Sequence, residues 1–336
     1  MPGTKKIIAV VGATGSQGGG LARALLADRD GPFALRALTR DAGSAGARRL
    51  AAAGAEVVAA DLDDETSVRA AFEGAYGAFV VTNFWAPRPE ADVRRRTAAQ
   101  MEQEQAGNAA RAARAAGLRH VIWSTLEDTR EVLRGDDGDG AGGSGAGGSG
   151  GPVPVLEGDY TVPHFDAKAE ADRLFTAEGV PTTFLRTAFF YEAFLGGMGP
   201  VRDGDGTLVL TLPMAGARLA AIASEDIGRT ALGVFRHPEL AGRTVSIAGA
   251  HHTGAEIAEL FTAALGEKVL YRPADLDEYR ASGGFAADEL ANMFAYYVRA
   301  AGTFTGERDL DTVRALNPGL QPLTDWLALH AAETVR

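Results

Sequence analysis

Short apolar runs alternate with amphipathic stretches along the first half of the chain, and this alternation predicts strands and helices in turn. Apolar, β-branched segments predict buried strands over 7–11, 34–39, 56–60, 78–81, 120–124 and 182–186. Between them, helices are predicted over 19–27, 45–53, 65–72, 98–116 and 164–177. The last helix has Pro163 before it and Gly179 after it, which are typical start and stop signals. Strands and helices in this order predict an α/β fold, a doubly wound parallel sheet covered by helices on both faces.

The second half of the chain is predicted to contribute to this sheet and to a second, smaller lobe. We expect residues 1–190 to form the first domain, and a returning segment of about 218–250, with helix 225–235 and strand 244–248, to complete its sheet. Residues 191–217 and 251–336 would form a mostly helical lobe. Residues 135–151 are almost all Gly, Ser, Ala and Asp, which predicts a flexible surface loop. That loop is either a mobile flap over the site or a tolerated insertion.

A glycine-rich turn follows the first predicted strand directly, because residues 12–18 read Gly-Ala-Thr-Gly-Ser-Gln-Gly. Glycines at the first, fourth and seventh places allow a tight turn, and the next helix directs its first amides to the same point. Backbone N–H groups and the helix dipole both favour an anion there, so the turn predicts a pyrophosphate site. A Walker loop is disfavoured, because no Gly-Lys-Ser/Thr follows. The alternative is an ordinary glycine-rich turn between a strand and a helix.

The residues after the second and third predicted strands bear on the choice of dinucleotide. An Arg at the end of the second strand accommodates a 2′-phosphate, whereas an acidic residue binds a 2′-hydroxyl. Arg40 therefore favours NADP over NAD, and Ser44 could add a hydroxyl. Asp41 would repel the phosphate unless it points away or belongs to a turn. Asp61 and Leu62 follow the third strand, where an adenine would lie, although Asp61 can also be a plain turn residue.

Candidate catalytic residues follow the later strands. Residues 82–84 would pass under the ribose and nicotinamide, and Ser124 ends the fifth predicted strand. His164 and Lys168 are four residues apart, so they share one face of a predicted helix. An imidazole there could exchange a proton near neutral pH. The alternative is a helix-start histidine and a surface lysine.

Composition narrows the class of function. Apolar residues make up 46% of the 336 residues and the formal net charge is −11, which argues against a nucleic-acid or anionic-membrane surface. Arg94-Arg95-Arg96 is the one basic triple, and it is expected on a solvated helix face. The chain has no cysteine, which excludes disulfides, thiolate metal sites and a cysteine nucleophile. No run is long enough to span a bilayer, and we expect a cytoplasmic protein without a metal.

Several ordered motifs resemble the NmrA-like family of atypical short-chain dehydrogenase/reductases. They are the glycine turn, Thr-Asn-Phe-Trp at 82–85, Trp-Ser-Thr-Leu-Glu-Asp-Thr-Arg at 123–130, His-Phe-Asp-Ala-Lys at 164–168, Phe-Phe-Tyr-Glu at 189–192 and Ser-Glu-Asp-Ile-Gly at 224–228. The resemblance implies a Rossmann domain that binds NADP(H). It implies that the pyrophosphate is bound by Gly12, Thr14, Gly15, Ser16, Gln17 and Gly18, and the 2′-phosphate by Arg40. The adenine would contact Asp61 and Leu62, and the ribose would contact Thr82, Asn83 and Phe84. Lys168 would bind the nicotinamide ribose, and the nicotinamide would lie beside Phe190, Tyr191 and Glu192.

Two functions remain open at this level. Ordinary short-chain dehydrogenases place a proton-donating Tyr four residues before the Lys, whereas this chain has His164. The first hypothesis is an NADPH-dependent oxidoreductase acting on a quinone or other carbonyl compound, with Ser124, His164 and Lys168 as catalytic residues. The second is a non-catalytic sensor of the NADPH/NADP⁺ balance that acts through a regulatory protein partner. A nucleotide-binding relic with neither activity is the simplest alternative.

Overall fold

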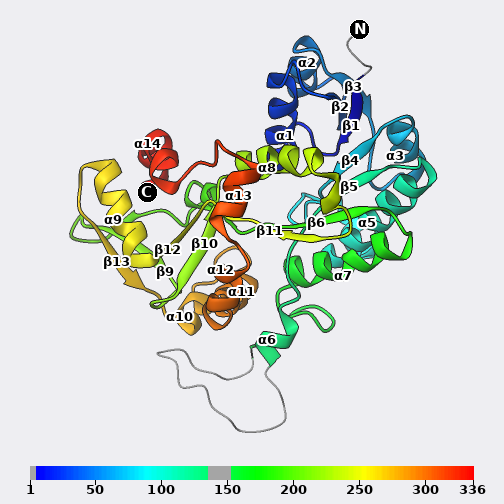
Figure 1. Ribbon diagram of the computed structural model, residues 1–336. Helices are drawn as coiled ribbons and strands as arrows, with labels where there is room; N and C mark the ends of the chain where they lie inside the picture. The colour runs from blue at the N-terminus through cyan, green and yellow to red at the C-terminus, as the bar shows by residue number, and fades with distance from the viewer. Residues whose placement is uncertain (1–4, 135–152) are drawn as a thin grey trace.

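A seven-stranded parallel sheet forms the centre of the first half of the chain (Figure 1). The computed structural model describes residues 5–134 and 153–336, so the predicted loop 135–151 lies outside the described residues. The strands run in the order β11-β6-β5-β4-β1-β2-β3. They are β1 (Lys6–Val10), β2 (Phe33–Thr39), β3 (Glu56–Ala59), β4 (Gly77–Val80), β5 (His120–Thr125), β6 (Thr182–Arg186) and β11 (Thr244–Ser246). The order reverses between β1 and β4, which is where ligands bind in open α/β sheets.

Helices cover both faces of this sheet, as the sequence predicts. The helices that accompany the seven strands along the chain are α1 (Ser16–Ala27), α2 (Ala45–Ala52), α3 (Glu65–Phe72), α4 (Glu90–Arg95), α5 (Ala98–Ala115), α6 (Arg130–Arg134), α7 (Pro163–Ala177) and α8 (Ser224–Arg236), of which α6 packs against α11 (Ala287–Arg299) of the second region. Helices α1 and α8 pack together on one face, and α3, α5 and α7 pack side by side on the other (Figure 1). Each face has its own apolar core, with Leu21 and Ile227 in one, and Phe72 and Phe175 in the other. The doubly wound fold is therefore confirmed.

Helix α1 begins at Ser16, three residues before the predicted start. Of the glycines that argue against a helix there, Gly20 is required by the packing of α1 against α8, as is Gly228 on α8. A Cβ atom on Gly228 would lie 2.0 Å from the backbone nitrogen of Leu21, and one on Gly20 would lie 2.5 Å from the carbonyl oxygen of Glu225. The two helices therefore touch backbone to backbone, and this contact outweighs the low helix propensity of glycine.

The rest of the chain contains two small sheets as well as helices. One sheet has the order β12-β10-β7 and the other β13-β9-β8. These strands are β7 (Phe189–Phe190), β8 (Val201–Arg202), β9 (Leu208–Leu212), β10 (Arg218–Ile222), β12 (Ala250–Thr253) and β13 (Val269–Pro273). From the returning segment 218–250, β11 extends the parallel sheet, whereas β10 belongs to a separate sheet. The division of the chain into a nucleotide-binding domain and a smaller lobe stays a prediction.

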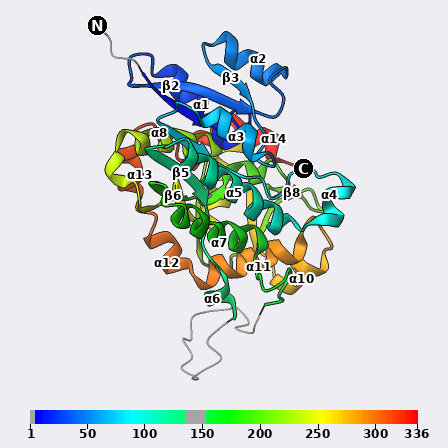
Figure 2. The ribbon, with the colours of Figure 1, turned by 90° about the vertical axis from the view of Figure 1, so that its right-hand side faces the viewer.

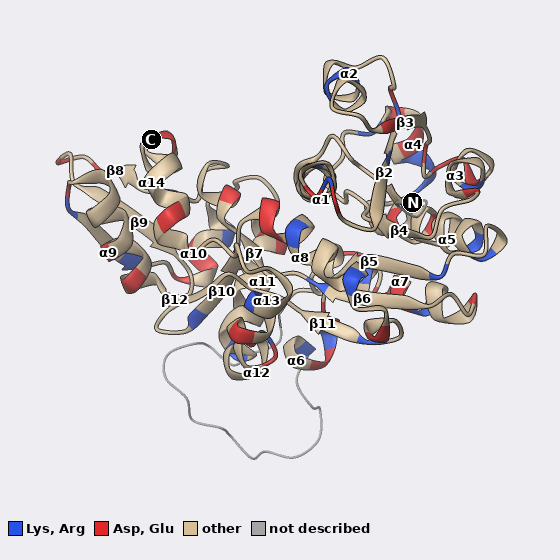
Figure 3. Ribbon diagram, turned by 45° about the horizontal axis from the view of Figure 1, so that its top comes forward, with Lys and Arg blue, Asp and Glu red and all other residues tan. Residues whose placement is uncertain are grey.

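Helices complete this second region. They are the 3₁₀ turns η1 (Tyr191–Phe194) and η2 (Pro238–Leu240), followed by α9 (Gly254–Leu265), α10 (Leu276–Ala281), α11 (Ala287–Arg299), α12 (Ala301–Gly306), α13 (Leu310–Leu316) and α14 (Leu323–Thr334). Helix α11 lies against the start of α7 and so joins the two regions (Figure 2). Lysines and arginines are interspersed with acidic residues over both regions (Figure 3).

The helices of residues 5–134 and 153–336 do not have the character of membrane spans. None of them combines the length and the apolar character that crossing a bilayer requires.

Candidate functional site

A cleft of about 560 Å³ opens beside the ends of β1, β2, β3 and β4, at the reversal of strand order. Most of the predicted cofactor-binding residues line it: Gly12, Thr14, Gly15, Ser16, Gln17, Gly18, Arg40, Ser44, Asp61, Leu62, Thr82, Asn83 and Phe190. The other predicted site residues are not among those that line it: Phe84, Ser124, His164, Lys168, Tyr191 and Glu192. The structure therefore gathers five separated segments of the sequence around one cavity.

The glycine turn has a shape that side chains would prevent. Gly12 has a φ of +63°, in the left-handed region that favours glycine. A Cβ atom on Gly18 would lie 2.5 Å from the carbonyl oxygen of Gly12 and 2.6 Å from that of Val11. Neither contact can be relieved by moving a side chain, because both oxygens belong to the backbone.

The start of α1 offers free hydrogen-bond donors to the cleft. The backbone amides of Ser16, Gln17 and Gly18 donate to no acceptor within residues 5–134 and 153–336. Gly15 occupies the N-cap and has no side chain to accept from them, and the first turn has no acidic residue. These amides lie at the positive end of the helix dipole. The start of α1 therefore has the free donors and the dipole that favour an anion.

The residues after β2 differ in the hydrogen bonds and ion pairs that their side chains form. Arg40 is exposed at the cleft and forms no ion pair with the described residues. The Asp41 Oδ1 accepts a hydrogen bond of 2.8 Å from the Gly43 amide, so Asp41 belongs to a turn, one of the two alternatives that the sequence left open. The Ser44 hydroxyl oxygen accepts from the Ala47 amide and caps α2. One unpaired guanidinium therefore stands at this edge of the cleft.

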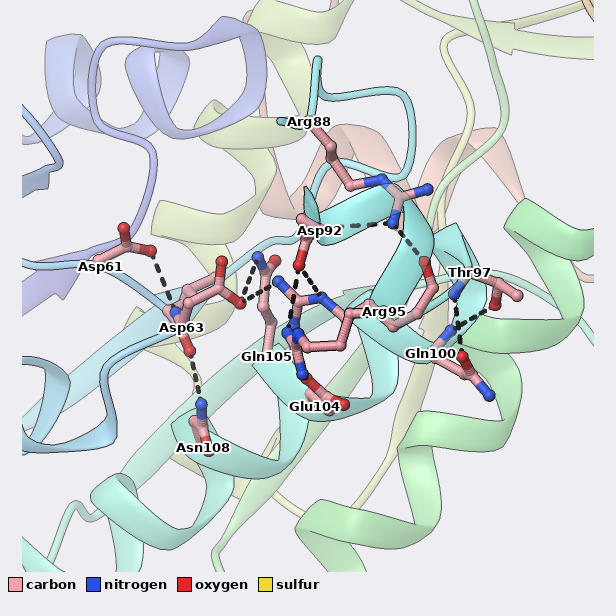
Figure 4. A network of polar contacts seen from close by, with 12 residues as sticks. Asp61, Asp63, Arg88, Asp92, Arg95, Thr97, Gln100, Glu104, Gln105 and Asn108 are labelled. Atoms are coloured by element: carbon pink, nitrogen blue, oxygen red, sulfur yellow. Dashed lines mark hydrogen bonds and ion pairs between the residues drawn. The ribbon is translucent and has the colours of Figure 1, made fainter. Parts of the chain in front are cut away.

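The turn after β3 is fastened to α5. Asp61 accepts a hydrogen bond from the Asp63 amide, and the Leu62 carbonyl oxygen accepts one of 2.7 Å from Asn108. Asp63 in turn accepts from Arg96 at 2.8 Å and from Gln105 at 3.2 Å (Figure 4). These bonds fix the segment where an adenine is predicted.

The three consecutive arginines, Arg94, Arg95 and Arg96, form ion pairs with acidic residues of this part of the structure. Arg96 has a buried side chain and pairs with Asp63, Asp92 and Glu104, while Arg95 pairs with the last two (Figure 4). Arg94 pairs with Glu90. All three positive charges are therefore compensated by carboxylates, and the triple carries no argument for a phosphate site.

A buried ionic group lies under the cleft. The Lys168 Nζ donates to the Thr82 hydroxyl at 2.7 Å and to Glu102 Oε1 at 2.9 Å. The Thr82 hydroxyl in turn donates to the same Glu102 oxygen at 2.6 Å. Glu102 is completely buried, and its second oxygen has no partner within the described residues. Lys168 is thus joined to Thr82, which lines the cleft.

Ser124 and His164 do not line the cleft, but they contact residues that line it or that adjoin the lining residues in the sequence. The Ser124 hydroxyl donates to Gln17 Oε1 at 2.7 Å, so it is held against the glycine turn. The ring of His164 lies beside Phe84 and Trp85, with centroid distances of 6.0 and 5.2 Å. These two residues continue the segment 82–83 that lines the cleft. Ser124 and Lys168 therefore each bond to a residue that lines the cleft, and His164 lies beside the two residues that follow Asn83.

The three residues predicted beside the nicotinamide, Phe190, Tyr191 and Glu192, have different surroundings in the structure. Phe190 lines the cleft, whereas Tyr191 is completely buried against Trp326 with a ring-centroid distance of 5.8 Å. Burial also raises the pKa of Tyr191. Both carboxylate oxygens of Glu192 accept from the Ser224 amide and cap α8. The predicted contacts of Tyr191 and Glu192 with a nicotinamide stay predictions.

Two acidic residues that the sequence analysis did not select hold the predicted catalytic residues. Glu102 binds Lys168, and Glu289 of α11 binds the Nδ1 atom of His164 at 2.6 Å. Glu102 lies on the buried stripe of α5 with Ala99, Ala106 and Ala109, a spacing that could have revealed it. Glu289 has no comparable signal, because it is 125 residues from His164 and resembles an ordinary first-turn acid.

Asp172 is a further titratable group on α7. Its Oδ1 accepts from the Thr125 hydroxyl at 2.7 Å and from the Trp123 indole at 2.9 Å. Burial raises the pKa of Asp172 to about 7, and the two hydrogen bonds offset this only in part. The folded chain therefore keeps a proton on Asp172 at pH values where the unfolded chain, with the ordinary value of 3.8, has lost it.

This difference predicts a loss of stability as the pH rises from about 4 to about 7, because the folded state binds more protons than the unfolded state there. Asp172→Asn keeps an oxygen acceptor and cannot ionise. We expect the variant to be more stable than the parent by about 1–3 kcal/mol at pH 8 and similar to it near pH 4. Urea unfolding at both pH values, with Asp288→Asn as an exposed control, measures this. An equal loss in parent and variant would contradict it.

Within residues 5–134 and 153–336, no three His, Asp or Glu side chains come together as ligands for a metal ion.

Curated proteins similar to this chain are named as oxidoreductases. An NmrA-like family domain-containing oxidoreductase of Aspergillus japonicus is 33% identical over 247 residues, covering 69% of this chain and 65% of that protein. The alignment thus spans just under two thirds of that relative. A protein of the same description from Cladobotryum is 29% identical over 316 residues, covering 89% of this chain and 85% of its own.

Solved structures of similar fold include two kinds of protein. NmrA, described as a negative transcriptional regulator, superimposes with a TM-score of 0.71 at 21% identity, covering 97% of this chain and 95% of its own. It has been solved with NADP and with NAD. An NADPH-dependent quinone oxidoreductase from Escherichia coli has a TM-score of 0.66 at 20% identity, covering 96% and 98%. A Citrobacter triphenylmethane reductase, solved with NADP(H), has a TM-score of 0.67 at 18% identity, covering 96% and 99%.

The model of the NmrA-like family matches residues 4–136 and 155–319, nearly the whole chain. The resemblance that the sequence motifs predict is therefore confirmed, and the chain belongs to the NmrA-like family.

Proposed function

We propose that this chain binds NADP(H) in the cleft and uses it to reduce a quinone or another carbonyl compound. The observation that carries the proposal is the start of α1, where three amides without acceptors among the described residues belong to residues that line the cavity. A pyrophosphate has the charge and the oxygen atoms to satisfy them. Arg40, which forms no ion pair with the described residues, lies at the same cavity and suits the 2′-phosphate that distinguishes NADP from NAD. These features fit the dinucleotide that the family implies.

The predicted catalytic residues, which contact the cleft through other residues, suggest a division of work. When bound, NADPH would supply a hydride from C4 of its nicotinamide. In this proposal Lys168, held by Thr82 and Glu102, orients the ribose, and Ser124 holds the oxygen of the substrate. His164 supplies a proton to that oxygen. A quinone suits this arrangement better than a ketone, because the reduced ring stabilises negative charge and needs less help from an acid.

The names of similar proteins support this choice. The relatives from Aspergillus japonicus and Cladobotryum are named oxidoreductases, and the fold is shared with a quinone oxidoreductase. The direct test is NADPH oxidation by the purified protein with a panel of quinones, aldehydes and ketones. Turnover of at least one of these classes is expected. Tight NADPH binding without turnover of any of them would contradict the proposal.

A second candidate is a sensor of the NADPH/NADP⁺ balance, favoured by the likeness to the transcriptional regulator NmrA over 97% of this chain. The ligands would then have to favour different conformations, because a ligand shifts an equilibrium only by its differential affinity. Limited proteolysis with each nucleotide, and a pull-down for a regulatory protein, test this function. Identical cleavage patterns and no partner would remove it.

Arg40→Leu is expected to weaken NADP⁺ binding by about 10- to 100-fold, because a charge-assisted hydrogen bond of about 1.5–3 kcal/mol is lost. NAD⁺ binding should change by less than about 3-fold, since NAD lacks the 2′-phosphate. Arg69→Leu is the control, because Arg69 is an exposed arginine of α3 that does not line the cleft. Calorimetry with both nucleotides measures the effect. Equal weakening of NADP⁺ and NAD⁺ would contradict a 2′-phosphate contact.

A further inference from the structure

His164 is held by an acidic residue from the other region of the molecule. One oxygen of Glu289, on α11, lies 2.6 Å from the His164 Nδ1 atom and 2.8 Å from its backbone nitrogen, at the start of α7. Both partners are almost completely buried, with 11% of each side chain exposed. We propose that Glu289 is a positioning residue that fixes His164 as the proton donor of the site. This inference rests on the proposed oxidoreductase function.

The geometry decides which ring nitrogen is available. An ionised carboxylate only accepts hydrogen bonds, so the hydrogen between the two residues is carried by Nδ1. The proton that His164 gives to a substrate must then come from Nε2. Within the described residues Nε2 has no hydrogen-bond partner, and it is not one of the fully buried polar atoms without a partner. It is therefore accessible from outside, while Nδ1 is engaged by Glu289.

The surroundings of this ring are aromatic. Trp85 lies 5.2 Å from the His164 ring and is 39% exposed, and Phe285, 74% exposed, lies 5.1 Å from Trp85. Large exposed aromatic side chains beside a cleft suit a planar aromatic ligand, which can stack on them. An aromatic quinone fits both this surface and a proton donor at Nε2. We therefore assign the substrate class as aromatic quinones.

The negative charge of Glu289 has a chemical purpose in this arrangement. Reduction of a quinone to a hydroquinone takes one hydride, which oxidises the reduced nicotinamide, and one proton. The proton leaves Nε2 for the quinone oxygen, and the solvent then returns one to Nε2. Glu289 stabilises the positive ring before the transfer and keeps Nδ1–H in place after it, as the acid does in the Asp-His pairs of hydrolases.

A cationic triphenylmethane dye separates proton delivery from hydride transfer. Its central carbon carries a positive charge, and addition of a hydride to that carbon gives the neutral, colourless dye. No proton is needed, so the reduction of the dye does not depend on His164 as an acid. A change that affects quinone reduction but spares dye reduction therefore identifies the proton step.

The test variant is Glu289→Gln, whose amide oxygen can still accept from both nitrogens of His164, so the fold and the start of α7 are preserved. Asp288→Asn is the matched control, because Asp288 is the exposed neighbour on the same helical turn. We expect Glu289→Gln to lower kcat for a naphthoquinone by about 10-fold or more, with KM nearly unchanged. Dye reduction should remain within about 2-fold of the parent, and Asp288→Asn should resemble the parent with both substrates.

A second measurement needs no turnover. The ¹⁵N resonances of the His164 ring, assigned by comparison with His164→Gln, report which nitrogen carries hydrogen in the free protein. We expect a hydrogen on Nδ1 in the parent, and a mixture of tautomers in Glu289→Leu. A deprotonated Nδ1 in the parent would overturn the inference. Equal kcat for parent and Glu289→Gln with the quinone, or equal losses with quinone and dye, would also overturn it. If the parent reduces neither substrate, it is the proposed function that fails.

Discussion

Gly18→Ala is expected to weaken NADPH binding by about 100-fold or more, because it spoils the turn that presents three amides to the pyrophosphate. The added methyl group would lie 2.5 and 2.6 Å from the carbonyl oxygens of Gly12 and Val11. Since these oxygens belong to the backbone, the turn itself must move. The loss of two hydrogen bonds to a charged group, at about 1.5 kcal/mol each, accounts for the predicted factor.

Gly19→Ala provides the matched control one residue further along α1. Its methyl group would meet the end of the Arg23 side chain at 3.2 Å rather than a backbone atom, and that side chain, which pairs with Glu225, is 59% exposed. Because this change does not crowd the turn, Gly19→Ala should bind NADPH like the parent. Both changes raise helix propensity by about 1 kcal/mol, so the folded state of Gly19→Ala should be slightly more stable. Calorimetry with NADPH and urea unfolding of both variants distinguish the two sites. Equal affinities in the two variants would contradict the assigned role of the turn.

The central sheet could be predicted well because a parallel sheet covered on both faces requires uniformly apolar strands. All seven of its strands lie within two residues of their predicted bounds. The start of α1 could not be predicted in the same way. It depends on contact with Gly228 of α8, a tertiary interaction that overrides the local preference of glycine.

The small sheets of the second region escaped the sequence analysis for a related reason. Strand β7 has only two residues, and its pairing with β10 joins segments about thirty residues apart. A two-residue strand has no measurable alternation of apolar and polar positions. Its existence depends on where the rest of the chain places its partner, and no local pattern records that.

The candidate site shows the same limit. The glycine turn, Arg40 and Thr82 were found because each follows a strand, and parallel strands bring their carboxyl ends to one edge. Glu102 and Glu289 were missed because their significance depends on the partners they meet, Lys168 and His164. Residues that contact a cofactor lie at positions that topology fixes. Residues that support them can come from any element that packs nearby.

The second large effect is expected on stability, at the buried group that Lys168 forms with Glu102 and Thr82. Lys168→Met is expected to destabilise the folded chain by about 3–5 kcal/mol, because it leaves the carboxylate of Glu102 buried without a countercharge. Glu102 is completely buried and one of its oxygens already has no partner, so water does not compensate the loss. Lys268→Met is the control, because Lys268 is exposed on the surface. Urea unfolding of the three proteins measures the difference.

The double variant Lys168→Met/Glu102→Gln separates this structural role from a catalytic one. Removing the carboxylate's charge should restore at least about 2 kcal/mol, while the Gln oxygen can still accept from the Thr82 hydroxyl. If Lys168 orients the cofactor, the double variant will fold but will oxidise NADPH with a quinone at least about 10-fold more slowly than the parent. Recovery of both stability and turnover would show that Lys168 serves only to neutralise Glu102. A folded but inactive double variant would place the ammonium group in the reaction, because stability and activity would then have been lost through different contacts of the same side chain.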